Sequence, residues 1–306
     1  MPAVIPFVSV LLPVLSALVA TPGASHANAP ATNAEQQGRA PDSLRVPILV
    51  YHNIQSAAEG RAVRGADLTM RPEVFAAQMQ YLKDHQIPVV SFTALVEALE
   101  GKRTLPAKAV VITFDDGRVN QLHNAVPLLK KLGFTATFFP FTHAMDRNPR
   151  YFTWAQLREL QQAGFTIGSH TSLHVRVDKM KDAKQMHEEV TGSREALQKN
   201  LGAAATEYFS YPFGALAAAG DSAARAAGYR AARAYTGGPW NSIHNRWRLR
   251  AVPVTENMKR FAEFVDPGIE AAKAAAKPAS KPSSKPAAKP ATRRGTAPAA
   301  ARSRSR

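Results

Sequence analysis

The chain has 306 residues, of which 45% are hydrophobic, 20% are charged and none is cysteine. This composition is too apolar for a chain that is disordered throughout, and the length suffices for one large domain or two small ones. The missing cysteines exclude a disulfide framework and thiolate chemistry, so any metal must be held by His, Asp or Glu.

The first segment of the chain is typical of an export signal. Its apolar run covers residues 4–20, ends at a Pro-Gly pair, and is followed at 25–27 by a small-x-small cleavage pattern. We expect residues 1–27 to be a signal peptide and residues 28–44 to be a linker, so that the protein is exported to the periplasm or out of the cell. An uncleaved membrane anchor is the alternative, and the prolines within the apolar run disfavour it.

Short apolar runs then alternate with amphipathic stretches over residues 45–266, a pattern that predicts parallel strands separated by helices. Seven or eight such units fit a barrel better than an open sheet, so we predict a single α/β domain of barrel type. Strands are expected at 46–51, 88–92, 109–114, 136–141, 165–169, 207–211, 229–235 and 248–254, and helices at 72–84, 120–132, 154–163, 178–201 and 222–227.

The last segment, residues 267–306, has a different composition. Ten Lys and Arg and no acidic residue lie between 271 and 306, which leaves +6 of the net charge of +16 to the rest of the chain. No large apolar residue follows Ile269, so this segment cannot bury a core and is predicted to be a disordered basic tail. Such a tail can bind an anionic surface or polymer, or it can be a solvated tether.

Polar side chains follow several predicted strands, where barrels carry their chemistry. Asp115 and Asp116 come directly after the third predicted strand, although neighbouring carboxylates repel and burial raises their pKa values. His170 and His174 follow the fifth strand, four residues apart, so both imidazoles can reach one ion. Two histidines and one carboxylate form a site with open positions for water, and a second carboxylate can take a proton from that water.

Three motifs in this order, TFDDG at 113–117, SHTSLH at 169–174 and YPFG at 211–214, resemble the first three motifs of the polysaccharide deacetylases of carbohydrate esterase family 4, the NodB-homology domain. The resemblance spans about residues 46–265 and includes ILVYHNI near the start and RWRLRAVPV near the end. It implies a distorted (β/α) barrel with fewer than eight strands and the hydrolysis of acetyl groups on sugars.

The resemblance also implies roles for individual residues. Asp116, His170 and His174 match the metal ligands, and Asp115 matches the general base. Zinc is the expected metal, and cobalt, nickel or iron fit the same ligands. Phe213 stands where a backbone N–H helps to hold the oxyanion in the family, a role that does not depend on its side chain.

The chain departs from the family pattern at two places. Ser210 replaces the arginine that orients the catalytic aspartate, and Arg118 is a candidate substitute. The late histidine that protonates the leaving amine is not evident. His52 resembles the early histidine of the poly-N-acetylglucosamine deacetylases of biofilm matrix, so we expect it to be the general acid, the alternative being a hydrogen-bonding role at the barrel mouth. Among the aromatic residues, Tyr211 and Trp240 are candidates to stack on sugar faces.

Together these patterns predict an exported, monomeric, metal-dependent N-deacetylase of an N-acetylglucosamine-containing polysaccharide, with no specific nucleic acid partner. A peptidoglycan deacetylase or an O-acetyl carbohydrate esterase would use the same residues. An inactive protein that binds glycans or polyanions is the alternative from another class, and the intact ligand set disfavours it.

Overall fold

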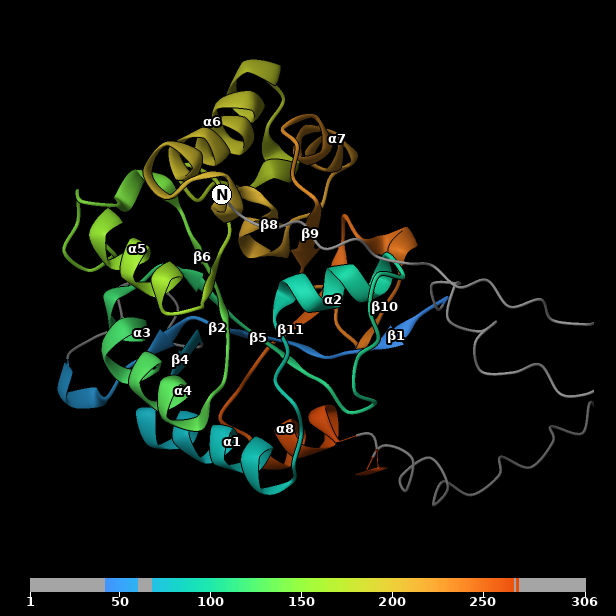
Figure 1. Ribbon diagram of the computed structural model, residues 1–306. Helices are drawn as coiled ribbons and strands as arrows, with labels where there is room; N and C mark the ends of the chain where they lie inside the picture. Colours follow the sequence, from blue (N-terminus) through green and yellow to red (C-terminus); the bar gives the residue numbers. More distant parts are fainter. Residues whose placement is uncertain (1–41, 60–67, 267, 270–306) are drawn as a thin grey trace, which may run out of the picture. The chain divides into compact units, whose positions relative to one another are not determined.

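The computed structural model describes residues 42–59, 68–266 and 268–269. These residues form a parallel β-barrel with helices packed around it (Figure 1). The predicted signal peptide, nearly all of the predicted linker and nearly all of the basic tail lie outside the described residues, so these three expectations stay predictions.

Seven strands form one sheet in which every neighbouring pair is parallel. A parallel bridge between Ser169 and Phe209 joins its two edges, with the Ser169 N–H donating to the Tyr208 carbonyl at 2.9 Å. The sheet is therefore nearly closed, and the predicted distorted barrel with fewer than eight strands is confirmed. The strands in order around the barrel are β7 (Thr166–Ile167), β6 (Thr137–Pro140), β5 (Val111–Asp116), β2 (Ile48–Tyr51), β11 (Leu249–Pro253), β9 (Ala231–Ala234) and β8 (Tyr208–Ser210).

Side chains of the strands alternate between the barrel interior and the outer layer of helices. On β2, Ile48 and Val50 belong to the interior cluster, whereas Leu49 packs in the outer core. On β5 the same alternation turns Asp115 inward. Since β5 continues to Asp116, both aspartates lie within the strand, and the predicted strand end before them was wrong.

A short helix, α2 (Phe92–Leu99), packs on the interior cluster near the amino-terminal ends of the strands. Sequence analysis predicted a strand at 88–92, but only Val89 forms a bridge there, and the Ser91 hydroxyl caps α2 by accepting a hydrogen bond from the Ala94 N–H at 3.0 Å. The apolar residues of this segment therefore belong to a buried helix, which a short apolar run does not distinguish from a strand.

The remaining helices lie outside the barrel (Figure 1). The predicted helix at 120–132 is interrupted at Ala125, because Pro127 lacks the N–H that would continue the first helix and fits the first turn of a new one that begins at Val126. The outer helices are α1 (Pro72–Asp84), α3 (Val119–Asn124), α4 (Val126–Leu132), α5 (Trp154–Gln162), α6 (Ala183–Leu201), α7 (Ala218–Ala226) and α8 (Met258–Val265).

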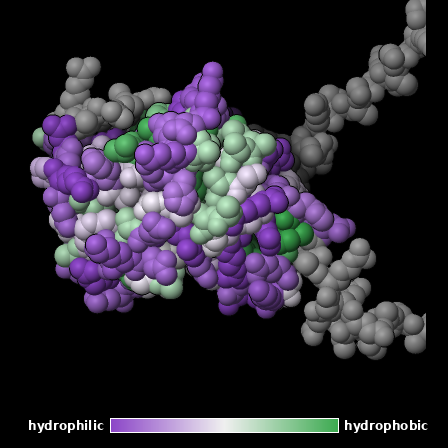
Figure 2. Space-filling view, turned by 90° about the horizontal axis from the view of Figure 1, so that it is seen from above, coloured by the Kyte–Doolittle hydropathy of each residue, from purple (hydrophilic) through white to green (hydrophobic). Residues whose placement is uncertain are grey.

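Two small strand pairs were not predicted. β1 (Leu44–Arg45) pairs antiparallel with β10 (Trp240–Asn241), and β3 (Asn53–Ile54) pairs parallel with β4 (Thr69–Met70). Within the part of the chain that the structure describes, no helix is both long and apolar enough to span a membrane. The face drawn in Figure 2 is mostly hydrophilic, with smaller hydrophobic areas between the polar residues.

Candidate active site

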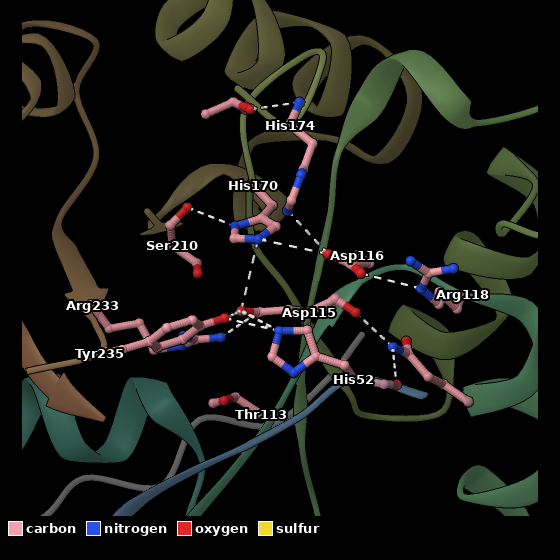
Figure 3. A network of polar contacts seen from close by, with 12 residues as sticks. His52, Thr113, Asp115, Asp116, Arg118, His170, His174, Ser210, Arg233 and Tyr235 are labelled. Atoms are coloured by element: carbon pink, nitrogen blue, oxygen red, sulfur yellow. Dashed lines mark hydrogen bonds and ion pairs between the residues drawn. The ribbon is translucent and has the colours of Figure 1, made fainter. Parts of the chain in front are cut away.

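The carboxyl ends of β5 and β7 bring Asp116, His170 and His174 together (Figure 3). His174 Nε2 lies 3.2 Å from Asp116 Oδ1, and His170 Nε2 lies 3.8 Å from the same oxygen. One nitrogen or oxygen atom of each residue lies within 4.8 Å of the other two. The three residues can therefore hold one metal ion.

The protonation and hydrogen bonding of these side chains fit a divalent cation. His170 Nδ1 lies 2.8 Å from the Ser210 carbonyl oxygen and donates to it, which leaves the Nε2 lone pair for an ion. Burial lowers the pKa of His170 to about 4, so the ring is neutral at pH 7. Asp116 Oδ1 and His170 Nε2 are buried and have no hydrogen-bond partner among the described residues, as expected of atoms that bind a metal. This donor set suits zinc and related transition metals.

The backbone is strained around this cluster. Asp116, Thr171, His174 and Phe213 all adopt left-handed conformations, with φ angles of 72°, 69°, 58° and 61°. Non-glycine residues rarely adopt such angles, and strained residues of this kind gather at functional sites. The strain indicates that the chain is bent to direct these side chains.

Glu189 on α6 holds the loop that carries His174. Its buried carboxylate accepts hydrogen bonds from the Ser172 N–H at 3.0 Å and the Leu173 N–H at 2.8 Å. The Thr171 hydroxyl also accepts from the His174 N–H at 3.0 Å. Sequence analysis did not identify Glu189, which lies in a helix that was predicted only from its amphipathic pattern.

The glycine of TFDDG is required by a close approach of two strands. Gly117 has a φ of 71°, and a Cβ at this position would lie 2.6 Å from Pro140 Cβ on β6. A larger residue would push β5 away from β6 at the point where Asp116 is presented.

Asp115 is fully buried and is held by two side chains, Arg233 on β9 and Tyr235 directly after β9. The Arg233 guanidinium pairs with Asp115 Oδ1, and the Tyr235 hydroxyl donates to Asp115 Oδ2 (Figure 3). The predicted substitute for the missing arginine, Arg118, contacts the other aspartate, with its Nε 3.1 Å from Asp116 Oδ2. The expectation for Arg118 was therefore wrong, because the side chain of Arg118 turns outward from the barrel whereas β9 directs Arg233 inward.

Burial raises the pKa of Asp115, but the charges of Arg233, His170 and His52, with the Tyr235 hydrogen bond, together lower it below its ordinary value. Burial likewise raises the pKa of Asp116, and contact with His174 and the charges of His52 and His170 bring it well below the ordinary value. Both carboxylates are thus ionised at neutral pH, and each has its own cationic partner.

His52, the predicted general acid, directly follows β2 and lies beside Asp115. Its Nε2 is 3.0 Å from the Tyr235 hydroxyl and 3.8 Å from Asp115 Oδ2. Burial lowers the pKa of His52. The charges of the two aspartates raise this pKa but offset only part of the effect of burial. Gln121 fixes both strand ends, because its side-chain amide donates to the His52 carbonyl at 2.8 Å and to the Asp115 carbonyl at 2.6 Å.

The three aromatic or backbone candidates have different positions. Phe213 is 51% exposed, and its ring centroid lies 4.7 Å from that of His174, so its side chain contacts a member of the cluster. Tyr211 is fully buried and donates to Asp221 at 2.8 Å, so its ring cannot stack on a sugar as predicted; strand alternation turns it outward into the core under α7. Trp240 pairs with Arg45, which precedes β2, whereas His52 follows the carboxyl end of β2. Trp240 therefore lies at the opposite end of the strand from the candidate site.

These observations define a class of protein, an α/β barrel with an Asp-His-His cluster that can hold a metal ion and a second, ion-paired aspartate at its strand ends. Residues 102–232 match the family model described as polysaccharide deacetylase. Over this segment, which is less than half of the chain, the protein is similar to the polysaccharide deacetylase family.

Individual relatives agree with this assignment. The Bacillus subtilis protein named "Putative polysaccharide deacetylase YxkH" is 31% identical over 170 residues, which cover 56% of this chain and 57% of that protein. The poly-β-1,6-N-acetyl-D-glucosamine N-deacetylase of Escherichia coli K12 is 27% identical over 136 residues, which cover 40% of this chain and 20% of that protein. The chain thus spans less than two thirds of either relative. The structure of the Streptococcus pyogenes deacetylase PplD in complex with acetate shares the fold, with a TM-score of 0.65 at 24% identity over 73% of this chain and 99% of that one.

Proposed function

We propose that this protein is an exported, metal-dependent hydrolase that removes acetyl groups from an N-acetylglucosamine-containing polysaccharide. The observation that carries the proposal is the pairing of a metal-binding cluster, Asp116, His170 and His174, with the ionised Asp115 next to it. Export is proposed from the signal-like segment at residues 1–27.

A divalent ion held by the cluster would polarise the acetyl carbonyl and lower the pKa of water. Asp115 is the proposed general base, which accepts a proton from that water. Arg233 and Tyr235 hold the carboxylate in one orientation and keep it ionised, which is the role that the family gives to the arginine missing at Ser210. The Phe213 backbone N–H is the proposed donor to the oxyanion, and the contact of the Phe213 ring with His174 puts this residue beside the cluster.

His52 is the proposed general acid for the leaving amine. The Tyr235 hydroxyl contacts both His52 Nε2 and Asp115 Oδ2, so a proton taken up by Asp115 has a hydrogen-bonded route to the histidine. His52 is only 6% exposed, which restricts the protons that it can exchange with bulk solvent.

The β-1,6-linked polymer is the first polysaccharide to test, because the Escherichia coli relative is named for that polymer. Leu173 and Phe213, which are 51% exposed, offer apolar surface beside His174 for the sugar ring or the acetyl methyl group.

The test is free-amine release from β-1,6-linked N-acetylglucosamine oligomers by the protein that lacks residues 1–27. We expect release that a chelator abolishes and that Asp115→Asn removes while metal content stays at the wild-type level. No release by the metal-loaded protein from these oligomers, together with release from peptidoglycan fragments or acetyl esters, would refute the substrate. No release from any of them would refute the enzyme.

A further inference from the structure

A polar cavity of about 420 Å³ lies beside the metal-binding cluster. It is formed by β3, the start of α3 and the loop at 149–150, and its volume is within the range of small-ligand sites. Its polar lining residues are Asn53, Gln55, Arg118, Asn120, His123 and Arg150, with Glu59 at one side.

Arg118 connects this cavity to the cluster. The side chain is 4% exposed, its Nε donates to Asp116 Oδ2 at 3.1 Å, and its guanidinium carbon lies 5.2 Å from the centre of the Tyr151 ring. Its two terminal nitrogens form no hydrogen bond to another described residue. A buried guanidinium with two unpaired terminal nitrogens is a strong binding group for a planar anion.

The rest of the lining offers further donors, and one buried acceptor, Asn120 Oδ1, also has no partner among the described residues. Asn53 is 1% exposed, its side-chain oxygen accepts from Asn120 at 3.2 Å, and its Nδ2 is buried with no partner among the described residues. Arg150 and His123 lie exposed at the rim. The acidic group of the lining, Glu59, already accepts hydrogen bonds at both oxygens, from Asn124 at 2.8 Å and from the Ser56 N–H at 2.6 Å.

We propose that this cavity is a subsite for a carboxylate on the sugar next to the one that loses its acetyl group. A carboxylate accepts hydrogen bonds and donates none, so it satisfies the surplus donors, whereas a hydroxyl would add a donor of its own. Because one guanidinium spans the distance from Asp116 to the cavity, the acetyl group and the carboxylate belong on adjoining sugars. The inference rests on the proposed deacetylase function, and among N-acetylglucosamine-containing polysaccharides it favours one with an acidic neighbouring sugar over the β-1,6-linked homopolymer, which carries no carboxylate.

The experiment compares two tetrasaccharides of N-acetylglucosamine alternating with either glucuronic acid or glucose, which differ only in the carboxylate. Kd is measured by calorimetry and acetate release by a coupled assay, with the metal-loaded protein. Arg150→Gln removes a cavity charge, and Arg147→Gln is the matched control, because Arg147 is exposed in the same loop and bonds to the His143 carbonyl. Arg118→Gln is measured with its metal content, since Arg118 contacts Asp116.

We expect the wild type and Arg147→Gln to bind the acidic tetrasaccharide at least about tenfold more tightly, and Arg118→Gln and Arg150→Gln to lose most of this preference. The preference should also weaken as salt is raised. Equal Kd values for the two sugars in the wild type, or an unchanged preference in metal-loaded Arg118→Gln, would overturn the subsite. Acetate release without a preference for the acidic sugar would refute the subsite and support the deacetylase function. A preference for the acidic sugar without acetate release would support the subsite and refute the deacetylase function.

Discussion

Replacement of Arg233 by methionine should destabilise the protein strongly at neutral pH. Arg233 and Asp115 are both fully buried, and the substitution leaves the aspartate charge without its cationic partner. Breaking a buried ion pair in this way costs about 3–5 kcal/mol in the free energy of unfolding. A matched control is Arg230→Met, because the Arg230 side chain is 25% exposed where it pairs with Glu100, and we expect it to cost at most about 1 kcal/mol.

The cost of Arg233→Met should depend on pH in a defined direction. In the wild type the pKa of Asp115 is lowered, so its contribution to stability is present above the unfolded pKa and is lost as pH falls through the folded pKa. Without Arg233, burial remains the largest influence and raises the folded pKa of Asp115 above its ordinary value of about 4. The variant therefore loses stability as pH rises from about 4, so the difference from wild type is larger at pH 7 than at pH 4.5.

Urea unfolding of the wild type, both arginine variants and the double variant Arg233→Met/Asp115→Asn, at pH 4.5 and pH 7, measures this effect. The double variant should recover much of the loss at pH 7, because it has no unpaired buried charge. Equal stability of Arg233→Met and wild type at pH 7, or a double variant less stable than Arg233→Met, would refute the buried-pair reasoning.

Three further predictions concern the same site. Asp116→Ala should lose bound metal, measured by mass spectrometry of the folded protein, and wild-type occupancy would disprove the ligand assignment. Tyr235→Phe should lower kcat/KM about tenfold to hundredfold. It should also move the acidic limb of the pH profile to higher pH, because the Tyr235 hydrogen bond lowers the pKa of Asp115 and its loss raises that pKa; an unmoved limb would contradict this. Gly117→Ala should lower the free energy of unfolding by at least about 2–4 kcal/mol, because the residue has a left-handed conformation and its new Cβ would meet Pro140. The control Gly133→Ala, at a φ of 69° with open space around it, should lower the free energy of unfolding by about 1–2 kcal/mol. Equal losses would contradict the close approach at Gly117.

The elements that depend on local pattern were predictable. Alternating apolar and amphipathic stretches indicated the parallel barrel, and the helix at 72–84 has the expected bounds. The segment at 88–92 was wrongly predicted as a strand, because a buried apolar residue such as Phe92 fits a strand and a helix equally well. Packing of Phe92 in the interior cluster selects the helix. The break in the helix at 120–132 had a local signal, Pro127, that the amphipathic pattern outweighed.

The spacing of His170 and His174 and the two neighbouring aspartates indicated a candidate metal site from the sequence, and the family resemblance selected Asp116 as the third ligand; the structure brings these three residues together. The environment of Asp115 was decided by the tertiary structure. Arg233 lies 118 positions away, and a strand of small residues with one arginine does not say which aspartate that arginine faces. Closure of the barrel sets this pairing, and it also turns Tyr211 into the core, because inward and outward directions exist only once β8 and β9 have their neighbours.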